Sequence, residues 1–104
     1  MQRVCFQFTL RPGTEAEYQR RHDEIWPEMV DALKRAGISN YTLFRRGLTV
    51  IAYAECEPDA ETAFANIGST DVDARWSEWF EDVIERRFDD DGKPMTAEEV
   101  WHLD

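Results

Sequence analysis

The sequence predicts an α+β fold, in which one antiparallel sheet carries helices on one of its faces. Three features support this prediction: an alternating apolar strand near the start of the chain, a hairpin of two strands in the middle, and helical apolar spacing on both sides of that hairpin. The resulting order is strand, helix, strand, strand, one or two helices, strand, which matches the split βαβ arrangement of ferredoxin-like folds. The length of 104 residues suits a single domain spanning 1–104.

The first strand is expected over residues 3–10, because apolar side chains alternate there with Cys5, Gln7 and Thr9. The apolar face of this strand consists of Val4, Phe6, Phe8 and Leu10. A turn at Arg11-Pro12-Gly13 then ends the strand.

The first helix is expected over residues 14–36, with Gly37 as its C-cap. Thr14 and Glu17 have the spacing of a capping box at the start of this helix. Pro27 cannot donate a backbone hydrogen bond, so this helix should kink or restart just after His22. The side chains expected to face inward are Tyr18, His22, Ile25, Trp26, Met29 and Leu33.

The middle of the chain predicts a hairpin of two strands, residues 40–46 and 48–56, which turns at Gly47. One set of alternating side chains on this hairpin is too apolar to face water. This set consists of Tyr41, Leu43, Ile51 and Tyr53. We therefore expect a second copy of the chain to cover the helix-free face of the sheet, as in a dimeric α/β barrel.

The second half of the chain predicts two further helices and a last strand. The first helix spans 58–68, with its proline in the first turn, and the second spans 69–84, starting from the capping residues Ser69-Thr70-Asp71. Its repeating apolar residues are Val72, Trp76, Trp79, Phe80, Val83 and Ile84. An acidic turn at 89–94 leads to a strand expected over 98–103.

Composition narrows the class of partner. A net charge of -10 disfavours nucleic acids, anionic membrane surfaces and anionic substrates. The chain shows no signal peptide and no apolar run long enough to cross a bilayer, so we expect a cytoplasmic location. Cys5 and Cys56 form no metal or redox motif, and the run 89–91 lacks calcium-loop spacing, so no metal is expected.

His22 is the candidate for chemistry, because it lies inward among aromatic residues. It is either a hydrogen-bonded structural histidine or a general acid or base. Tyr18, one turn earlier, is a possible second proton relay or sugar contact, and Asp23 and Glu24 can stabilise the imidazolium. The chain also has four tryptophans, whose flat indoles suit either the core or the apolar face of a sugar ring.

Five short blocks carry a resemblance to a known family. They are Tyr18-Gln19-Arg20-Arg21-His22, Ile25-Trp26-Pro27-Glu28, Asn40-Tyr41, Ser69-Thr70-Asp71-Val72 and Arg75-Trp76. With these blocks the chain resembles the L-rhamnose mutarotases over nearly its whole length. The resemblance implies a dimeric ferredoxin-like barrel that interconverts the α and β anomers of a deoxysugar without a cofactor or a metal.

The resemblance also implies roles for individual residues. His22 corresponds to the proton donor, and Tyr18, Tyr41 and Trp76 correspond to residues that line the sugar site. Ser77 stands where the family usually has a second tryptophan, so one wall of the site differs here. The proton acceptor stays open between Tyr18, an acidic side chain and a water molecule.

Two other functions are compatible with the predicted fold. One is a haem-dependent or cofactor-free monooxygenase, since dimeric α/β barrels host that chemistry as well. The other is a non-catalytic sugar-binding module, in which the same aromatic residues bind a sugar and His22 is structural.

Overall fold

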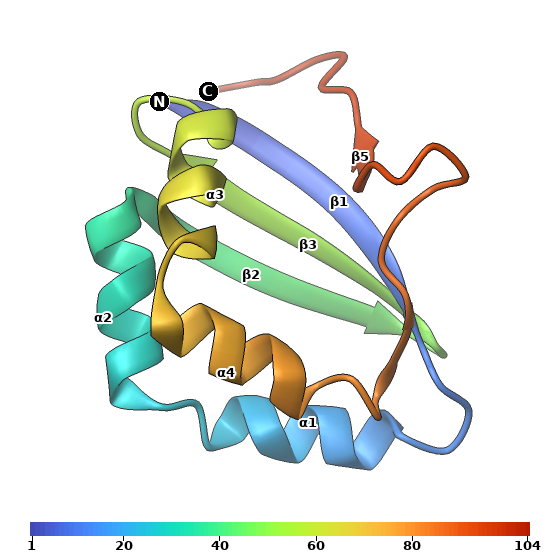
Figure 1. Ribbon diagram of the computed structural model, residues 1–104. Coiled ribbons are helices and arrows are strands. Elements are labelled where there is room, and N and C mark those ends of the chain that lie inside the picture. Colours follow the sequence, from blue (N-terminus) through green and yellow to red (C-terminus); the bar gives the residue numbers. More distant parts are fainter.

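The structure, a computed structural model, describes residues 1–104 and contains one antiparallel sheet with four helices on one of its faces (Figure 1). Its elements are β1 (Gln2–Leu10), α1 (Glu15–Asp23), α2 (Pro27–Ala36), β2 (Ile38–Arg46), β3 (Thr49–Cys56), α3 (Ala60–Gly68), α4 (Asp71–Trp79), β4 (Ile84–Arg86) and β5 (Met95–Ala97). The strand order is β2-β3-β1-β4, and β5 also pairs with β1. The predicted α+β fold and its ferredoxin-like arrangement are therefore confirmed. No helix combines the length and the apolar character needed to cross a membrane.

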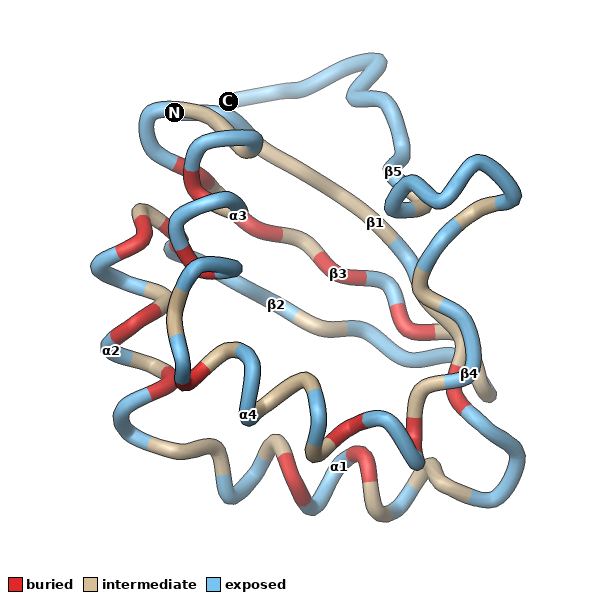
Figure 2. Tube along the Cα trace, in the orientation of Figure 1, coloured by how far each residue is buried: buried red, intermediate tan, exposed pale blue.

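The core lies between the sheet and the helices, and Figure 2 shows buried residues alternating along β3. The helix-facing side chains of β3 are Val50, Ala52, Ala54 and Cys56, all fully buried. Two clusters result. One joins α2, α3 and the start of α4 to the sheet, and the other joins Leu10, Tyr18, Val50, Phe80 and Val83. The second cluster matters for function because it fixes Tyr18 from α1 against the sheet.

The predicted break after His22 is confirmed, because α1 ends at Asp23 and α2 begins at Pro27. The proline occupies the first turn of α2, where its missing N–H leaves no intrahelical bond unmade. Gly37 caps α2 at a φ of 98°, and a side chain there would collide with the backbone of Glu57. The restart lets α1 and α2 take different directions around the sheet (Figure 1).

The predicted capping box at the start of α1 is wrong. Thr14 occupies the N-cap position, but its hydroxyl donates to the carbonyl of Arg11 at 2.7 Å instead of capping the helix. Glu17 pairs with Arg20 at 2.6 Å. A nearby arginine competes better for the glutamate than the backbone does, because both partners are charged.

The helix expected over 69–84 ends at Trp79, although Thr70 does cap it by accepting from the N–H of Asp73 at 3.2 Å. Phe80 and Val83 continue the apolar spacing in turns, and Ile84 starts β4 opposite Leu10. The helical spacing of these apolar residues therefore indicated that they are buried in one cluster, but they do not form one continuous helix.

Two further boundaries differ from the predictions. Asp59 is the N-cap of α3, accepting from Thr62 N–H at 2.7 Å, so Pro58 precedes that helix. The last strand is β5, and residues 98–104 form no strand. Trp101 in this tail is 76% exposed, so apolar residues there indicated an uncovered segment and not a half-buried strand.

A bulge in β2 changes which residues face the helices. Ser39 pairs with Glu55 and Thr42 with Tyr53, so two residues of β2, Asn40 and Tyr41, stand opposite one residue of β3. This extra residue turns the side chains that follow it to the opposite face. Tyr41 and Leu43 consequently face the helices, contrary to the prediction, whereas Ile51, Tyr53 and Phe44 lie on the helix-free face.

Candidate active site

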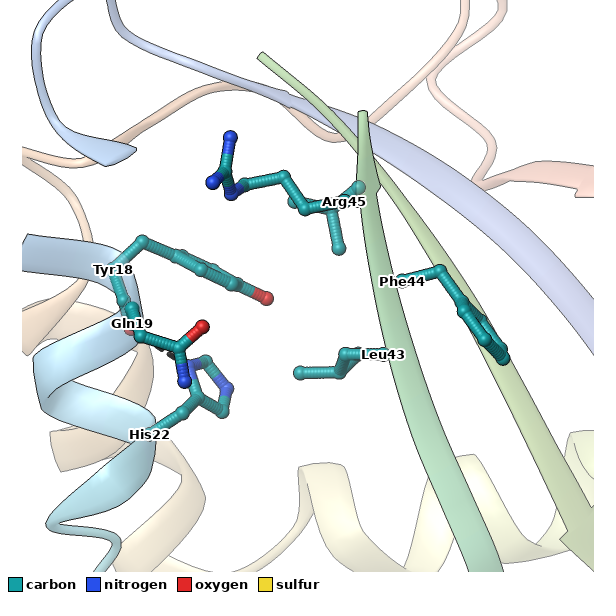
Figure 3. Close-up of a pocket in the computed structure, with 7 residues that line it drawn as sticks. Tyr18, Gln19, His22, Leu43, Phe44 and Arg45 are labelled. Carbon is teal, nitrogen blue, oxygen red and sulfur yellow. Dashed lines mark hydrogen bonds between the residues drawn. The ribbon is translucent and has the colours of Figure 1, made fainter. Parts of the chain in front are cut away.

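The centre of the candidate site is a pair of rings on α1. Tyr18 and His22 are four residues apart, so they share one side of the helix, and their ring centroids lie 4.5 Å apart. Both line a pocket of about 140 Å³ between α1 and the β2–β3 hairpin (Figure 3). The residues around this pocket are Tyr18, Gln19, His22, Leu43, Phe44, Arg45 and Val50. The structure thus brings together the predicted proton donor and one predicted sugar contact.

The imidazole of His22 is held by the backbone of its own helix. Its Nδ1 lies 3.2 Å from the carbonyl oxygen of Tyr18, and because a carbonyl only accepts, Nδ1 carries the proton. The other nitrogen, Nε2, remains free to exchange a proton with a ligand. Burial lowers the pKa of His22 below its ordinary value of 6.5, although the Tyr18 carbonyl and the Asp23 carboxylate both favour the charged ring.

Aromatic residues from α4 and its C-terminal turn close one side of the imidazole. Trp76 meets the His22 ring edge to face at 5.5 Å, and Phe80 lies 5.2 Å from it. Trp79 stacks on Trp26 at 5.2 Å, and neither Trp76 nor Trp79 lines the pocket itself. Trp76 is therefore the tryptophan in contact with the candidate catalytic ring.

Arg21 lies outside the pocket but supports the helix that carries Tyr18 and His22, a role that the sequence did not reveal. It is buried, donates to the Trp79 carbonyl, and binds both oxygens of Asp82 at 2.9 and 3.1 Å. Its guanidinium also lies 5.0 Å from the Trp79 ring centroid. These contacts lower the pKa of Asp82 and join α1 to the end of α4. Since the partners lie about sixty positions along the chain, no local pattern could have revealed them.

Tyr41 and Ser77 lie further from the pocket. Tyr41 is 39% exposed and contacts Phe6, which with Phe8 forms an aromatic path to Tyr18. Burial of its hydroxyl end raises the pKa of Tyr41 to about 12. Ser77 is half-buried on α4, next to Trp76, and its hydroxyl makes no hydrogen bond within the chain. Neither residue lines the pocket beside His22.

The positions of the acidic, histidine and cysteine side chains bear on metal binding. No three of them lie in a group that could hold a metal ion. The chemistry that His22 offers is proton transfer through its free Nε2, next to a phenol and an indole.

Comparison with known proteins identifies the family. The family model described as L-rhamnose mutarotase matches residues 3–103. An L-rhamnose mutarotase of Burkholderia orbicola (strain MC0-3) is 38% identical over 106 residues, and one of Bacteroides thetaiotaomicron is 33% identical over 104 residues; each alignment covers 100% of both chains.

A solved structure shows the same fold. The crystal structure of an L-rhamnose mutarotase from Formosa agariphila superimposes with a TM-score of 0.81 and covers 100% of both chains, at 24% sequence identity. None of these comparisons favours a monooxygenase or a non-catalytic module. With its family model matched from residue 3 to residue 103, the chain belongs to the L-rhamnose mutarotase family.

Proposed function

We propose that this chain interconverts the α and β anomers of L-rhamnose, as an isomerase acting on a carbohydrate. The observation that carries the proposal is the free Nε2 of His22, which faces a pocket beside Tyr18 in a chain of this family. The L-rhamnose mutarotases of Burkholderia and Bacteroides match this chain over its entire length, which supports assigning the same reaction to it.

The reaction needs one proton donor and one proton acceptor. A proton is delivered to the ring oxygen while another leaves the anomeric hydroxyl, so the C1–O5 bond breaks and an open-chain aldehyde forms. Rotation about the C1–C2 bond then presents the other face of the aldehyde, and the reverse proton transfers close the ring. Positioned acid and base groups typically accelerate such steps by roughly 100- to 10,000-fold.

His22 serves as the proton donor in this proposal. Its Nδ1–H is held by the Tyr18 carbonyl, so a second proton can be carried only on Nε2, on the side that faces the pocket. Burial raises the pKa of Tyr18, which disfavours its phenolate and suits Tyr18 to hydrogen bonding with the sugar. The proton acceptor is then a carboxylate or a water molecule.

The remaining predicted site residues complete the proposal as sugar contacts. The indole of Trp76, which already packs against His22, suits the C–H face of a deoxysugar. The hydroxyl of Ser77 is without a partner in the chain and can hydrogen-bond a sugar hydroxyl. Tyr41, from β2, contributes a phenol that burial keeps neutral.

Saturation transfer between the two anomer signals of L-rhamnose, measured by proton NMR, tests this function. We expect wild-type protein to accelerate exchange over buffer, and His22→Ala to lose about 100-fold or more of that acceleration. The matched control is His102→Ala, because His102 is exposed and pairs only with Asp104. Equal rates for wild type and His22→Ala, at equal protein concentration, would refute the catalytic role of His22.

We further propose a homodimer that packs through the helix-free sheet face. Phe44 and Ile51 are opposite each other on neighbouring strands there, and they are 59% and 37% exposed. A second copy would remove this apolar surface from water.

We also propose a cytoplasmic location, since both cysteines are free thiols, as in reducing compartments.

A further inference from the structure

Two charged side chains between the sheet and the helices lack partners. Asp73 lies on α4 and Arg87 directly follows β4, and both are half-buried. Neither side chain makes a hydrogen bond or an ion pair within the chain. Their charged neighbours differ in this respect, because Arg75 pairs with Asp71 at 3.0 Å and Arg86 with Asp90 at 3.1 Å.

The register of β4 places Arg87 on the helix-covered face of the sheet. Arg86 stands opposite Thr9, which belongs to the helix-free face of β1. Because successive residues of an extended chain point to opposite faces, Arg87 points to the side occupied by Phe8. Phe8 contacts Tyr18 at 6.1 Å, so Arg87 enters the region next to the site.

The helical position of Asp73 brings it to the same region from the other side. It precedes Trp76 by three residues and Phe80 by seven, so the three share one side of α4 and its C-terminal turn. Trp76 and Phe80 both contact His22. Asp73 therefore extends the surface against which His22 packs.

Electrostatic effects support this placement. The charge of Asp73 raises the pKa of Tyr41, and the charge of Arg87 acts to lower the pKa of Tyr18, Tyr41 and Asp73. Burial is the dominant cause for Asp73, and it raises the pKa of that carboxyl. Since charges act on one another most strongly at short range, these effects agree with the placement of Asp73 and Arg87 on the side of the sheet that carries Tyr18 and Tyr41.

We propose that Asp73 and Arg87 bind hydroxyl groups of the sugar other than the anomeric one, and that they determine which monosaccharide the site accepts. This inference rests on the proposed function, because it places the reacting end of the sugar at His22. A carboxylate accepts hydrogen bonds from hydroxyls and a guanidinium donates to their oxygens. Together the two side chains can therefore recognise hydroxyl groups at two positions of the sugar ring. A bound sugar would supply the partners that both charges lack in the free chain.

Kinetic measurements on Asp73→Asn and Arg87→Gln test the proposal. For each variant we expect KM for L-rhamnose to rise roughly 10- to 100-fold with kcat within about threefold, as when a ground-state contact is lost. The matched controls are Asp71→Asn on the same helical turn and Arg86→Gln next in sequence, whose side chains lie in solvent. Thermal melts of all four variants exclude a loss of folding as the cause.

A second measurement uses analogues of L-rhamnose that each lack one ring hydroxyl other than the anomeric one. Wild type should discriminate against the forms that lack a contacted hydroxyl, and each variant should lose the discrimination at one position only. KM values equal to those of the controls, with unchanged discrimination, would overturn the proposal. If wild type binds L-rhamnose in ligand-observed NMR without exchanging its anomers, the proposed function fails, and the same variants judged by Kd still decide this inference.

Discussion

His22 combines a fixed orientation with a weakened basicity. The carbonyl of Tyr18 fixes which nitrogen faces the pocket, and burial makes the neutral ring the main form at neutral pH. The protonated form of His22, which is the form that can donate a proton, is consequently the minor one at neutral pH. A residue in this state can return to neutrality readily after it has given up its proton, which suits a reaction that runs in both directions.

The pH profile of anomer exchange follows from this state. His22 is fully protonated, and so able to donate, only below its own pKa in the folded protein, and burial places that pKa under 6.5. We therefore expect kcat/KM to rise as the pH falls from 8 through neutrality and to level off below the lowered pKa. Exchange rates, corrected at each pH for the buffer reaction and for the unfolded fraction, give the profile. A rate that instead increases with pH would make His22 the proton acceptor.

Among single residues, spacing predicted inward positions better than it predicted partners. Tyr18 and His22 could be placed on one side of a helix because helical geometry is local. Arg21 lies between them in sequence and is as buried as Tyr18, yet the sequence gives it the appearance of a surface charge, since its partner Asp82 lies 61 positions away. The position of Arg87 could not be predicted either, because it depends on the register of β4, a strand that the sequence did not reveal.

At the scale of elements, the bulge in β2 positions the site. Asn40 takes a φ of 47°, and the extra residue there turns Tyr41 and Leu43 to the helix-covered face of the sheet. Alternation along the hairpin predicted the opposite face, because a period of two carries no sign of an inserted residue. The same limit applies to α4, whose apolar spacing continues after Trp79 through turns that fill the same core cluster.

Substitution of Asn40 tests the role of the bulge. Asn40→Val and Asn40→Gly both remove the hydrogen bond from the Asn40 amide to Glu55, but only valine is strained at positive φ. We expect Asn40→Val to lower the free energy of unfolding by about 1–2 kcal/mol more than Asn40→Gly. Urea titrations of the two variants measure this difference. Equal unfolding free energies would show that the backbone relaxes without cost.

The whole molecule leaves one face of its sheet without helices, and the C-terminal tail is also uncovered. Figure 2 shows the tail after β5 as a continuous exposed segment, and its apolar residues are Val100, Trp101 and Leu103. The tail is attached to the sheet by an ion pair between Arg3 and Glu99 at 2.8 Å. Both features expose apolar surface in one molecule, and a second copy can cover that surface without any change of fold.

The apolar residues on the open sheet face predict that the protein is a dimer in solution. Wild-type protein at micromolar concentration should sediment at twice its mass of 12.2 kDa, and Ile51→Glu should shift it to the monomer. The reason is that a charge at this position of the open face would be buried without a partner in the dimer. Ala74→Glu adds the same charge to an exposed position on α4 and should leave the dimer intact. Sedimentation equilibrium separates these outcomes. A monomeric wild type would mean that Phe44 and Ile51 face water in solution, and the dimer proposal would then be wrong.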